Sequence, residues 1–348
     1  MMLLGLRGTG KTVLLNEIGK IAETEGVIVS RIEAPEDASL GRLIAPEMRR
    51  VMRSLSSIAA ARQLAVRGLR GLRNLVSSLN IHVGEIGIGI EGADQPEPGL
   101  ADSGDLEFDL PELFELIGAA ASRAGKGWLL LIDEVQYLND ADLSALIVAL
   151  HRVSQSERPV TFAGAGLPQV ARLAGDAKSY AERLFTYPPI GALAPSAARQ
   201  AISRPLEAEG VAISEDAVLR IVDATKGYPF FLQEWGHTVW DISEGPTIDL
   251  DHVERARLPV MNSLDNGFFK VRMDRLTRAE TSFVAAMARL GDGPYPIGDI
   301  ARELGRSTQS LGPTRASIIH KGMIYSAEHG YLAFTVPLFA DFMRRQMT

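Results

Sequence analysis

The feature that most constrains this chain is a glycine-rich segment at its start, GLRGTGKT, which occupies residues 5–12. The segment satisfies the pattern G-x-x-x-x-G-K-[ST] in full. It lies between an apolar stretch, Met1–Leu4, and a run with helical spacing of apolar residues, Lys11–Glu25. A strand, a glycine turn and a helix are the context in which backbone N–H groups curl round a phosphate. We therefore expect an α/β protein that binds a phosphate-bearing ligand.

Each position of this segment has an expected role. The loop amides and the helix N-terminus would hold phosphates, Lys11 would neutralise the β- and γ-phosphate charge, and Thr12 would ligate Mg²⁺. An ordinary glycine-rich turn without a ligand is the alternative. The expected nucleotide-binding residues are Gly5, Arg7, Gly8, Thr9, Gly10, Lys11, Thr12 and Val13.

An acid pair, Asp133-Glu134, follows the wholly apolar run Trp128–Ile132. Such a run predicts a buried parallel strand, whose carboxyl end would place Asp133 at the edge where a metal could bind. Asp133 is then expected to hold Mg²⁺, and Glu134 to polarise the water that attacks the γ-phosphate. With Lys11, Glu134 is predicted to be catalytic. The alternative is that both acids are strand-end carboxylates that cap the next helix.

The chain is predicted to contain three domains. Strand and helix patterns alternate over residues 1–192, which predicts a P-loop NTPase sheet of parallel strands with helices on both faces, and an Arg-rich helical insertion at 40–79. The alternating stretch 81–90 reads as a β-ribbon. Residues 193–265 have only helical patterns and are expected to form a small helical domain, whereas 266–348 predict three helices and a hairpin, which is a winged helix.

Composition excludes several classes of protein. Of 348 residues, 46% are hydrophobic and 23% are charged, which is typical of a globular chain. The absence of cysteine excludes disulfides and a cysteine nucleophile, and the six scattered histidines do not predict a transition-metal site. No apolar run is long enough for a membrane span, and no signal segment is recognisable, so we expect a cytoplasmic protein.

The net charge of -7 conceals two basic regions. Residues 267–348 have an excess of basic side chains, and residues 42–73 contain eight arginines against the single acid Glu47. Both could bind DNA, the first through a recognition helix at 310–321. The alternatives are a protein-contacting winged helix, a solvated helical face, or a partner for the acidic loop 94–109. The exposed candidates of the C-terminal region are Arg315, Ser317, His320, Lys321, His329, Arg344 and Arg345.

The stretches GLRGTGKT, LLLIDEVQYL, VTFAGAGLPQ, YAERLF and ATKGYPFFLQ together resemble the AAA+ P-loop ATPases, in their archaeal-ATPase and initiator-like branch. The chain also resembles actinobacterial ATP-binding proteins with the order ATPase, helical lid, winged helix. This resemblance covers nearly the whole chain. It implies an ATPase that couples binding and hydrolysis of Mg²⁺-ATP to domain rearrangement, acting on DNA, on a protein client, or as a homo-oligomer. A DNA-binding regulator or scaffold with ATP as a slowly cycling ligand is the alternative.

The resemblance also implies roles for two further residues. Pro229 of the Gly-Tyr-Pro stretch would pack near the adenine, although it could equally begin a helix after a glycine cap. Arg183 would reach the γ-phosphate of a neighbouring subunit, and its alternative is an ion pair with Glu182.

Three departures from the family pattern lower the expected activity. Gly164-Ala165-Gly166 stands where a polar residue usually orients the attacking water, and no arginine follows Gly227 as a second sensor. The chain also begins in its first strand, so we expect part of the adenine pocket to be missing from this sequence. Hydrolysis is therefore expected to be slow or to need a partner.

Overall fold

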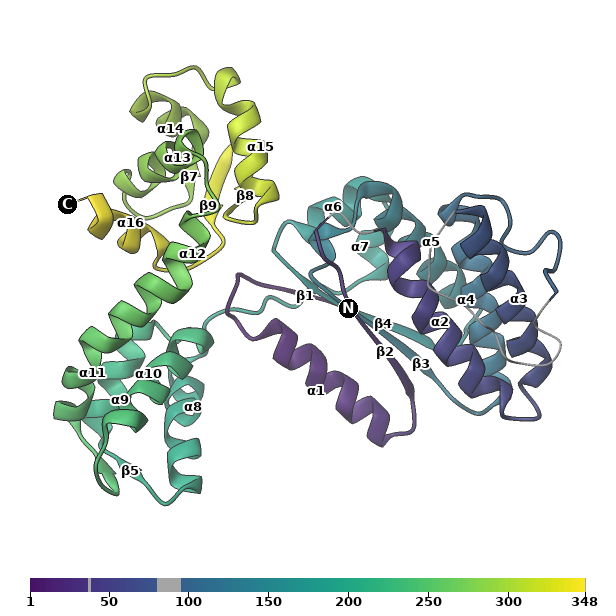
Figure 1. Ribbon diagram of the computed structural model, residues 1–348, viewed down its shortest axis with the longest axis horizontal. Helices are drawn as coiled ribbons and strands as arrows, with labels where there is room; N and C mark the ends of the chain where they lie inside the picture. Colours follow the sequence, from purple (N-terminus) through teal and green to yellow (C-terminus); the bar gives the residue numbers. More distant parts are fainter. Residues whose placement is uncertain (37–38, 80–94, 348) are drawn as a thin grey trace. The chain divides into compact units, whose positions relative to one another are not determined.

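The computed structural model describes residues 1–36, 39–79 and 95–347 and contains two compact units (Figure 1). The first unit comprises Met1–Leu4 and Lys11–Pro189, and the second comprises Gly5–Gly10 and Ile190–Thr348. The short segment Gly5–Gly10 thus clusters with the second unit, although its neighbours in the chain belong to the first. The expected β-ribbon at 81–90 lies outside the described residues.

The first unit is built on a four-stranded parallel sheet in the order β1-β4-β3-β2, which confirms the predicted α/β fold. The apolar residues near 185–190 predict a further short strand, but the structure has only a single parallel bridge there, between Leu4 and Pro189. The strands are β1 (Met2–Leu4), β2 (Ile28–Glu33), β3 (Trp128–Asp133) and β4 (Val160–Gly166).

Strand β3 is central because its sequence suits burial on both faces. All six residues of this strand are buried between β4 and β2, and the Trp128 indole N–H donates to the Ser30 hydroxyl at 3.0 Å. Parallel pairing places Asp133 opposite Glu33 at the carboxyl ends of their strands. The sheet edge thereby receives the acid that the sequence predicts there.

Helices cover this sheet and form the insertion. The predicted helical insertion at 40–79 consists of α2 and α3, which pack against each other and, with α4, bury one hydrophobic core (Figure 1). Helix α4 begins where the Asp105 carboxylate accepts the N–H of Glu107 at 2.9 Å. The helices are α1 (Lys11–Thr24), α2 (Leu40–Ser56), α3 (Arg62–Ser78), α4 (Leu106–Arg123), the 3₁₀ turn η1 (Val135–Tyr137), α5 (Asp140–Gln155), α6 (Val170–Ala177) and α7 (Ala181–Leu184).

After Gly5–Gly10, the second unit continues with four helices in the region predicted to be helical. They are joined by loops and by a two-stranded parallel pair, and the side chains between them are apolar. The elements are α8 (Pro195–Ala208), β5 (Ala212–Ile213), α9 (Glu215–Thr225), α10 (Pro229–Ile242), β6 (Thr247–Ile248) and α11 (Leu250–Ser263).

The C-terminal region adds the three predicted helices and the predicted hairpin, and also elements that the sequence patterns did not indicate. Strand β7 joins the hairpin in an antiparallel sheet of order β7-β9-β8, a π-helical turn extends α11, and a final amphipathic helix closes the region. The elements are η2 (Leu264–Phe269), α12 (Lys270–Met273), α13 (Arg278–Arg289), β7 (Tyr295–Pro296), α14 (Ile297–Glu303), η3 (Gln309–Leu311), α15 (Gly312–His320), β8 (Ile324–Glu328), β9 (Tyr331–Phe334) and α16 (Phe339–Met347).

One hydrophobic core runs from α8 to α16 without a gap at residue 265. Phe269 lies at its middle, stacked on Phe342 at 5.1 Å and 6.3 Å from Phe231. The lid helices and the C-terminal region therefore share their core. The division of the chain at 192 and 265, and the winged-helix assignment, stay proposals.

Candidate nucleotide site

The first unit brings the two principal sequence motifs into contact. Helix α1 begins at Lys11, and the Thr12 hydroxyl in its first turn donates to Oδ2 of Asp133 at 2.5 Å. The other carboxylate oxygen of Asp133 accepts the N–H of Glu134 at 2.8 Å. Lys11 and Asp133 are both buried, at 7% and 8% exposure. A hydroxyl and a carboxylate thus meet at the carboxyl edge of the sheet, 121 residues apart in the chain.

Glu134 occupies an unusual backbone conformation at this edge. Its φ of 55° and ψ of 41° are left-handed, which is uncommon for a residue other than glycine and costs on the order of 1 kcal/mol. The side chain is half-buried, and its carboxylate accepts a hydrogen bond from the amide of Gln136. Strain of this kind is concentrated at functional positions.

Gln136 is a site residue that the sequence analysis missed. Its Nε2 donates to the Glu134 carboxylate, and its Oε1 accepts the N–H of Leu167 at 3.0 Å, just beyond the end of β4. A Cβ on Gly166 would approach the Gln136 oxygen to 2.7 Å, so glycine makes room for this amide. The only signal in the sequence was an amide two residues after an acid.

The structure also corrects the expected end of strand β4. The sequence predicts that the strand ends at Ala163, which would make Gly164-Ala165-Gly166 the turn after it. Instead β4 continues to Gly166, and these three residues pair in parallel register with β1. The polar group at this strand end comes from Gln136, on a different element.

The remaining residues of the glycine-rich segment, Gly5–Gly10, have the geometry of a tight loop. Gly8 and Gly10 have φ values of 82° and 86°, which other residues rarely adopt. A Cβ on Gly5 would lie 2.1 Å from the Ile190 carbonyl oxygen, so no side chain fits there. The Thr9 hydroxyl donates to the Leu6 carbonyl at 2.9 Å and closes the turn.

Within the second unit, this loop is hydrogen-bonded to two other segments. The carbonyl of Gly8 accepts the N–H of Phe230 at 3.1 Å, and the N–H of Arg7 donates to the Thr335 carbonyl at 3.0 Å. Phe230 belongs to α10, and Thr335 directly follows β9. The loop backbone is thus held both by a lid helix and by the C-terminal region.

Three guanidinium groups gather near this loop. Arg272 lies 3.9 Å from the ring centre of Phe268, which in turn stacks on Phe230 at 4.2 Å. Burial, together with the positive charges of Arg7 and Arg275, lowers the pKa of Arg272 to about 10. The sequence pattern of the family places an arginine directly after Gly227, whereas Arg272 lies in α12.

Gly227 and Pro229 serve the local structure of the second unit. Lys226 and Gly227 are both left-handed at the end of α9, and a Cβ on Gly227 would meet the Leu193 carbonyl oxygen at 2.7 Å. Pro229 is the first residue of α10, where a missing N–H costs nothing. The local alternative weighed from the sequence therefore describes what these residues do here, and a contact of Pro229 with adenine stays a prediction.

Arg183 lies in the short helix α7 with its side chain exposed. In the described part of the chain this residue makes no ion pair with Glu182. Its role in reaching a neighbouring subunit stays a prediction.

Much of the basic charge of the C-terminal region is neutralised internally. Lys321 and Ser317 both donate to Glu280 at 2.6 Å, and Arg345 pairs with Asp265 at 2.5 Å. Arg344 pairs with Asp341 and donates to the Ala288 carbonyl. Arg315, His320 and His329 remain exposed. The predicted recognition helix, α15, therefore offers few cations for DNA.

The Arg-rich insertion keeps more of its cations on the surface. Arg50 and Arg67 pair with Glu47 and Glu97. Along α2 and α3 the side chains of Arg42, Arg53 and Arg62 are exposed and make no ion pair with another described residue.

The chain has two oxygen-bearing side chains, Thr12 and Asp133, that fit the coordination of Mg²⁺ bound to a nucleotide. Mg²⁺ usually keeps most of its water and takes one or two protein oxygens, which the paired hydroxyl of Thr12 and carboxylate of Asp133 can supply. No group of three or more histidine and acidic side chains suited to a metal occurs among residues 1–36, 39–79 and 95–347. Over the same residues, no helix has the length and apolarity that a bilayer span needs.

Comparison with known proteins supports the predicted resemblance to P-loop ATPases. The family model described as an AAA ATPase domain matches residues 1–162. Residues 1–162, just under half of the chain, are thus similar to an AAA ATPase domain. A domain of unknown function matches residues 266–343, and a comparison with curated proteins found no match.

Solved structures similar to the chain include proteins of Pyrococcus abyssi, Thermotoga maritima and Aeropyrum pernix. The Walker-type ATPase of Pyrococcus abyssi aligns with 15% identity and a TM-score of 0.60, over 99% of this chain and 90% of that one. This likeness shows a shared fold and agrees with the predicted resemblance to archaeal P-loop ATPases. Thermotoga maritima RuvB aligns with 15% identity and a TM-score of 0.46, over 95% and 83% of the chains. Aeropyrum pernix Orc1 in complex with DNA aligns with 14% identity and a TM-score of 0.41, over 99% of this chain and 86% of that one. The TM-scores of these two structures are too low to show a shared fold.

Proposed function

We propose that this protein binds Mg²⁺-ATP and hydrolyses it slowly, and that the nucleotide state alters the lid and C-terminal region. The observation that carries the proposal is the 2.5 Å contact between the Thr12 hydroxyl and the Asp133 carboxylate. These two residues come from the two motifs that a magnesium nucleotide site requires. The match of residues 1–162 to the AAA ATPase domain supports the same function.

Polyphosphate binding would rest on the loop amides, Lys11 and the N-terminus of α1. The positive φ values of Gly8 and Gly10 turn the backbone so that successive N–H groups can converge on an anion. Lys11 supplies a compact positive charge at the first position of the helix. Mg²⁺, held by Thr12 and Asp133, would neutralise charge on the phosphate oxygens.

Hydrolysis would use Glu134 and Gln136. The Glu134 carboxylate is the base that would take a proton from the attacking water, and the Gln136 amide fixes its orientation. Gln136 is itself fixed by the Leu167 N–H, so the pair is positioned before any ligand binds. Gln136 would thus supply the polar group that Gly164-Ala165-Gly166 does not.

The test compares nucleotide binding and turnover in two variants. Lys11→Ala should weaken binding of a fluorescent ATP analogue at least about tenfold, because it removes a charge from the phosphate site. Glu134→Gln should retain binding and lose phosphate release. Glu33→Gln, which alters the strand-end acid beside Asp133, is the matched control. Unchanged affinity in Lys11→Ala would refute the phosphate assignment.

Coupling to the second unit would pass through the loop Gly5–Gly10. The Gly8 carbonyl and the Arg7 N–H are bonded to Phe230 and Thr335, so a loop that tightens on phosphate must alter or strain both bonds. Hydrogen exchange at Phe230 and Thr335, with and without Mg²⁺-ATP, would measure this coupling.

A second candidate function, a DNA-binding regulator that uses ATP as a slow switch, is favoured by the exposed arginines of α2 and α3. Arg42, Arg53 and Arg62 could contact phosphates, which would make binding steeply dependent on salt. The triple change of these residues to alanine should weaken duplex DNA binding, whereas Arg315→Ala should have little effect. Rapid turnover without DNA would exclude this second function, and a salt-sensitive DNA complex without turnover would favour it.

Assembly into a homo-oligomer would give Arg183 a role. An exposed arginine on a short helix can reach a phosphate on a neighbouring subunit. If so, mixing Arg183→Ala protein with Lys11→Ala protein should restore turnover that neither has alone.

A further inference from the structure

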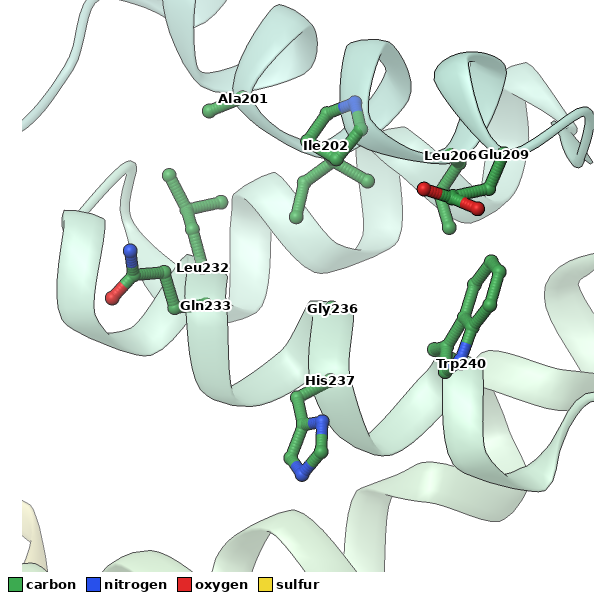
Figure 2. A pocket seen from close by; sticks show the side chains of 10 residues that line it. Ala201, Ile202, Leu206, Glu209, Leu232, Gln233, Gly236, His237 and Trp240 are labelled. Atoms are coloured by element: carbon green, nitrogen blue, oxygen red, sulfur yellow. The ribbon is translucent and has the colours of Figure 1, made fainter.

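The lid contains an open groove that the proposed ATPase function does not use. It has a volume of about 310 Å³ and lies between α8 and α10, with side chains from both helices facing it (Figure 2). Ile202 and Leu206 of α8 and Leu232 of α10 make its apolar floor. The volume is at the lower end of pockets that bind small molecules.

Gly236 keeps this groove open. It lies in the middle of α10, and a Cβ placed there would meet only Ile202, at an ordinary 3.6 Å. Glycine is a poor choice for a helix interior, by roughly 1 kcal/mol relative to alanine, and nothing in the packing requires it. Its effect is to leave space where a larger side chain would fill the groove.

Polar groups gather at one end of the groove. Trp240 is 40% exposed and lines this end together with Glu209 (Figure 2). Glu209 makes no ion pair or side-chain hydrogen bond with any other residue that the structure describes. Trp235, on the same helix, is buried at 5% exposure.

The electrostatics of this end favour a cation. Helices α8 and α10 end at Ala208 and Ile242, so the negative ends of both helix dipoles lie near Glu209 and Trp240. Among the described lining residues there is no lysine or arginine. His237, at the rim, has its Nε2 3.5 Å from a carboxylate oxygen of Asp241. An indole face adds attraction for a positive charge.

We propose that this groove binds a small organic cation with an apolar body, its charge between Glu209 and Trp240 and its body along Leu206, Ile202 and Leu232. A carboxylate without a partner and an exposed indole select the charge, and the apolar floor selects the body. From Ile202 to Glu209, the residue that follows α8, the backbone rises by about 10 Å along the helix axis. This length matches a ligand of about six carbons plus an ammonium group. This site is separate from the nucleotide-binding residues and stands without the proposed ATPase function.

The experiment uses hexyltrimethylammonium as the cationic probe, with hexanol and hexanoate as neutral and anionic probes of similar length. Binding to the full chain is followed by the indole ¹⁵N–¹H signals in NMR, assigned with Trp240→Phe. The cation should shift the Trp240 signal saturably and bind about tenfold more tightly than hexanol, with hexanoate weaker still. The buried Trp235 and Trp128 should report little change.

Two variants separate charge from shape. Glu209→Gln should remove most of the preference for the cation over hexanol, while Glu207→Gln, an exposed acid of the same helix that does not line the groove, should leave it unchanged. Gly236→Leu should block all probes by filling the groove. Gly236→Ala should fold as well as the parent and weaken binding only slightly, and circular dichroism checks both.

Three outcomes would overturn the proposal. Equal binding of the cation and hexanol would show that Glu209 and Trp240 do not select charge. Shifts that persist in Gly236→Leu would show that the probe binds elsewhere. A Trp240 signal that moves with protein concentration alone would show that a second copy of the chain covers the groove.

Discussion

At the scale of single residues, the candidate site depends on contacts between side chains that are distant in sequence. Thr12 and Asp133 meet because α1 starts and β3 ends at the same edge of a parallel sheet. Gln136 holds Glu134 because β4 runs on to Gly166 and offers the Leu167 N–H as an anchor. The motif residues were recognisable in the sequence, but their partners were not, because hydrogen bonds across strands leave no periodic pattern.

The first prediction concerns Gln136. The change Gln136→Ala should lower ATP turnover by about tenfold or more, because Glu134 loses the donor that orients it, and should leave ATP affinity within about twofold. Phosphate release and binding of a fluorescent ATP analogue measure the two quantities. Gln155→Ala, at the exposed end of α5, is the control. Equal loss of binding and turnover would show that Gln136 stabilises the fold and does not orient Glu134 towards the attacking water.

The second prediction concerns pH and Glu280. Burial raises the pKa of this carboxyl, but hydrogen bonds from Lys321, Ser317 and Thr277 outweigh it and lower the pKa from 4.5 to about 2. The folded state thus binds the proton less readily than the unfolded state. Ionised Glu280 stabilises the fold fully above pH 4.5, and this contribution disappears as the pH falls towards 2.

Urea unfolding at pH 7 and pH 3 tests this dependence. At pH 7, Glu280→Gln should lower the free energy of unfolding by about 2 kcal/mol, because Lys321 loses its charged partner. The difference from the parent should shrink at pH 3. Glu328→Gln, at an exposed strand end, is the control. A difference that is the same at both pH values would contradict the assigned direction of the pKa shift.

At the scale of helices and strands, periodicity predicted most elements, and packing decided their ends and joints. The sequence indicated α1 to within one residue, and it indicated the helical character of the region that forms the four lid helices. It missed β7, which has only two residues, and α16, whose apolar Phe339, Phe342 and Met343 form a helical face too short to stand out. Short elements are stabilised by their neighbours and not by their own pattern.

The third prediction tests a joint between two helices. Asp142, in the first turn of α5, accepts the N–H of Leu40 at 2.8 Å and so anchors the start of α2. Asp142→Ala should leave this buried N–H without its acceptor and cost about 2 kcal/mol in the free energy of unfolding. Asp140→Ala, in the same turn but exposed, should cost a few tenths of a kcal/mol. If both changes lower the free energy of unfolding equally, the two acids act only through their charge at the N-terminus of α5, and the hydrogen bond to Leu40 contributes nothing.

At the scale of the whole molecule, the chain forms two units, and Gly5–Gly10 clusters with the second although the strand and helix on either side belong to the first. The sequence places this loop within an N-terminal domain, as continuity of the chain suggests. Its hydrogen bonds to Phe230 and Thr335, which only the tertiary structure shows, assign it otherwise. Within the candidate nucleotide segment, Gly5–Gly10 therefore belong to the second unit, and Lys11 and Thr12 belong to the first.

The fourth prediction follows from ligand linkage. If Mg²⁺-ATP binds the folded chain alone, a concentration of one hundred times Kd should stabilise it by about 2.7 kcal/mol and raise Tm. Lys11→Ala should abolish the rise, and chelation of Mg²⁺ should reduce it. Differential scanning fluorimetry with ATP and with an equal concentration of sulfate measures the effect. An equal rise with sulfate would indicate unspecific anion binding.

The fifth prediction tests the shared core of the second unit. Phe269 is 1% exposed and contacts rings from the lid and from α16, so Phe269→Ala should cost about 3–5 kcal/mol in the free energy of unfolding. Phe108→Ala, with a 69% exposed ring on α4, should change stability little. If a fragment ending at residue 265 folds as cooperatively as the full chain, the lid does not depend on this core.

The sequence by itself determined the α/β class, the glycine-rich loop, and the acid pair at the end of β3. These depend on local patterns, since apolar periodicity and glycine spacing are properties of neighbouring residues. Only the tertiary structure decided that Gln136 holds Glu134, that Arg272 lies beside Arg7, and that Gly236 opens a groove lined by Glu209 and Trp240. Each of these depends on which elements pack together, and the free energy of packing is spread over distant residues, so no local pattern encodes it.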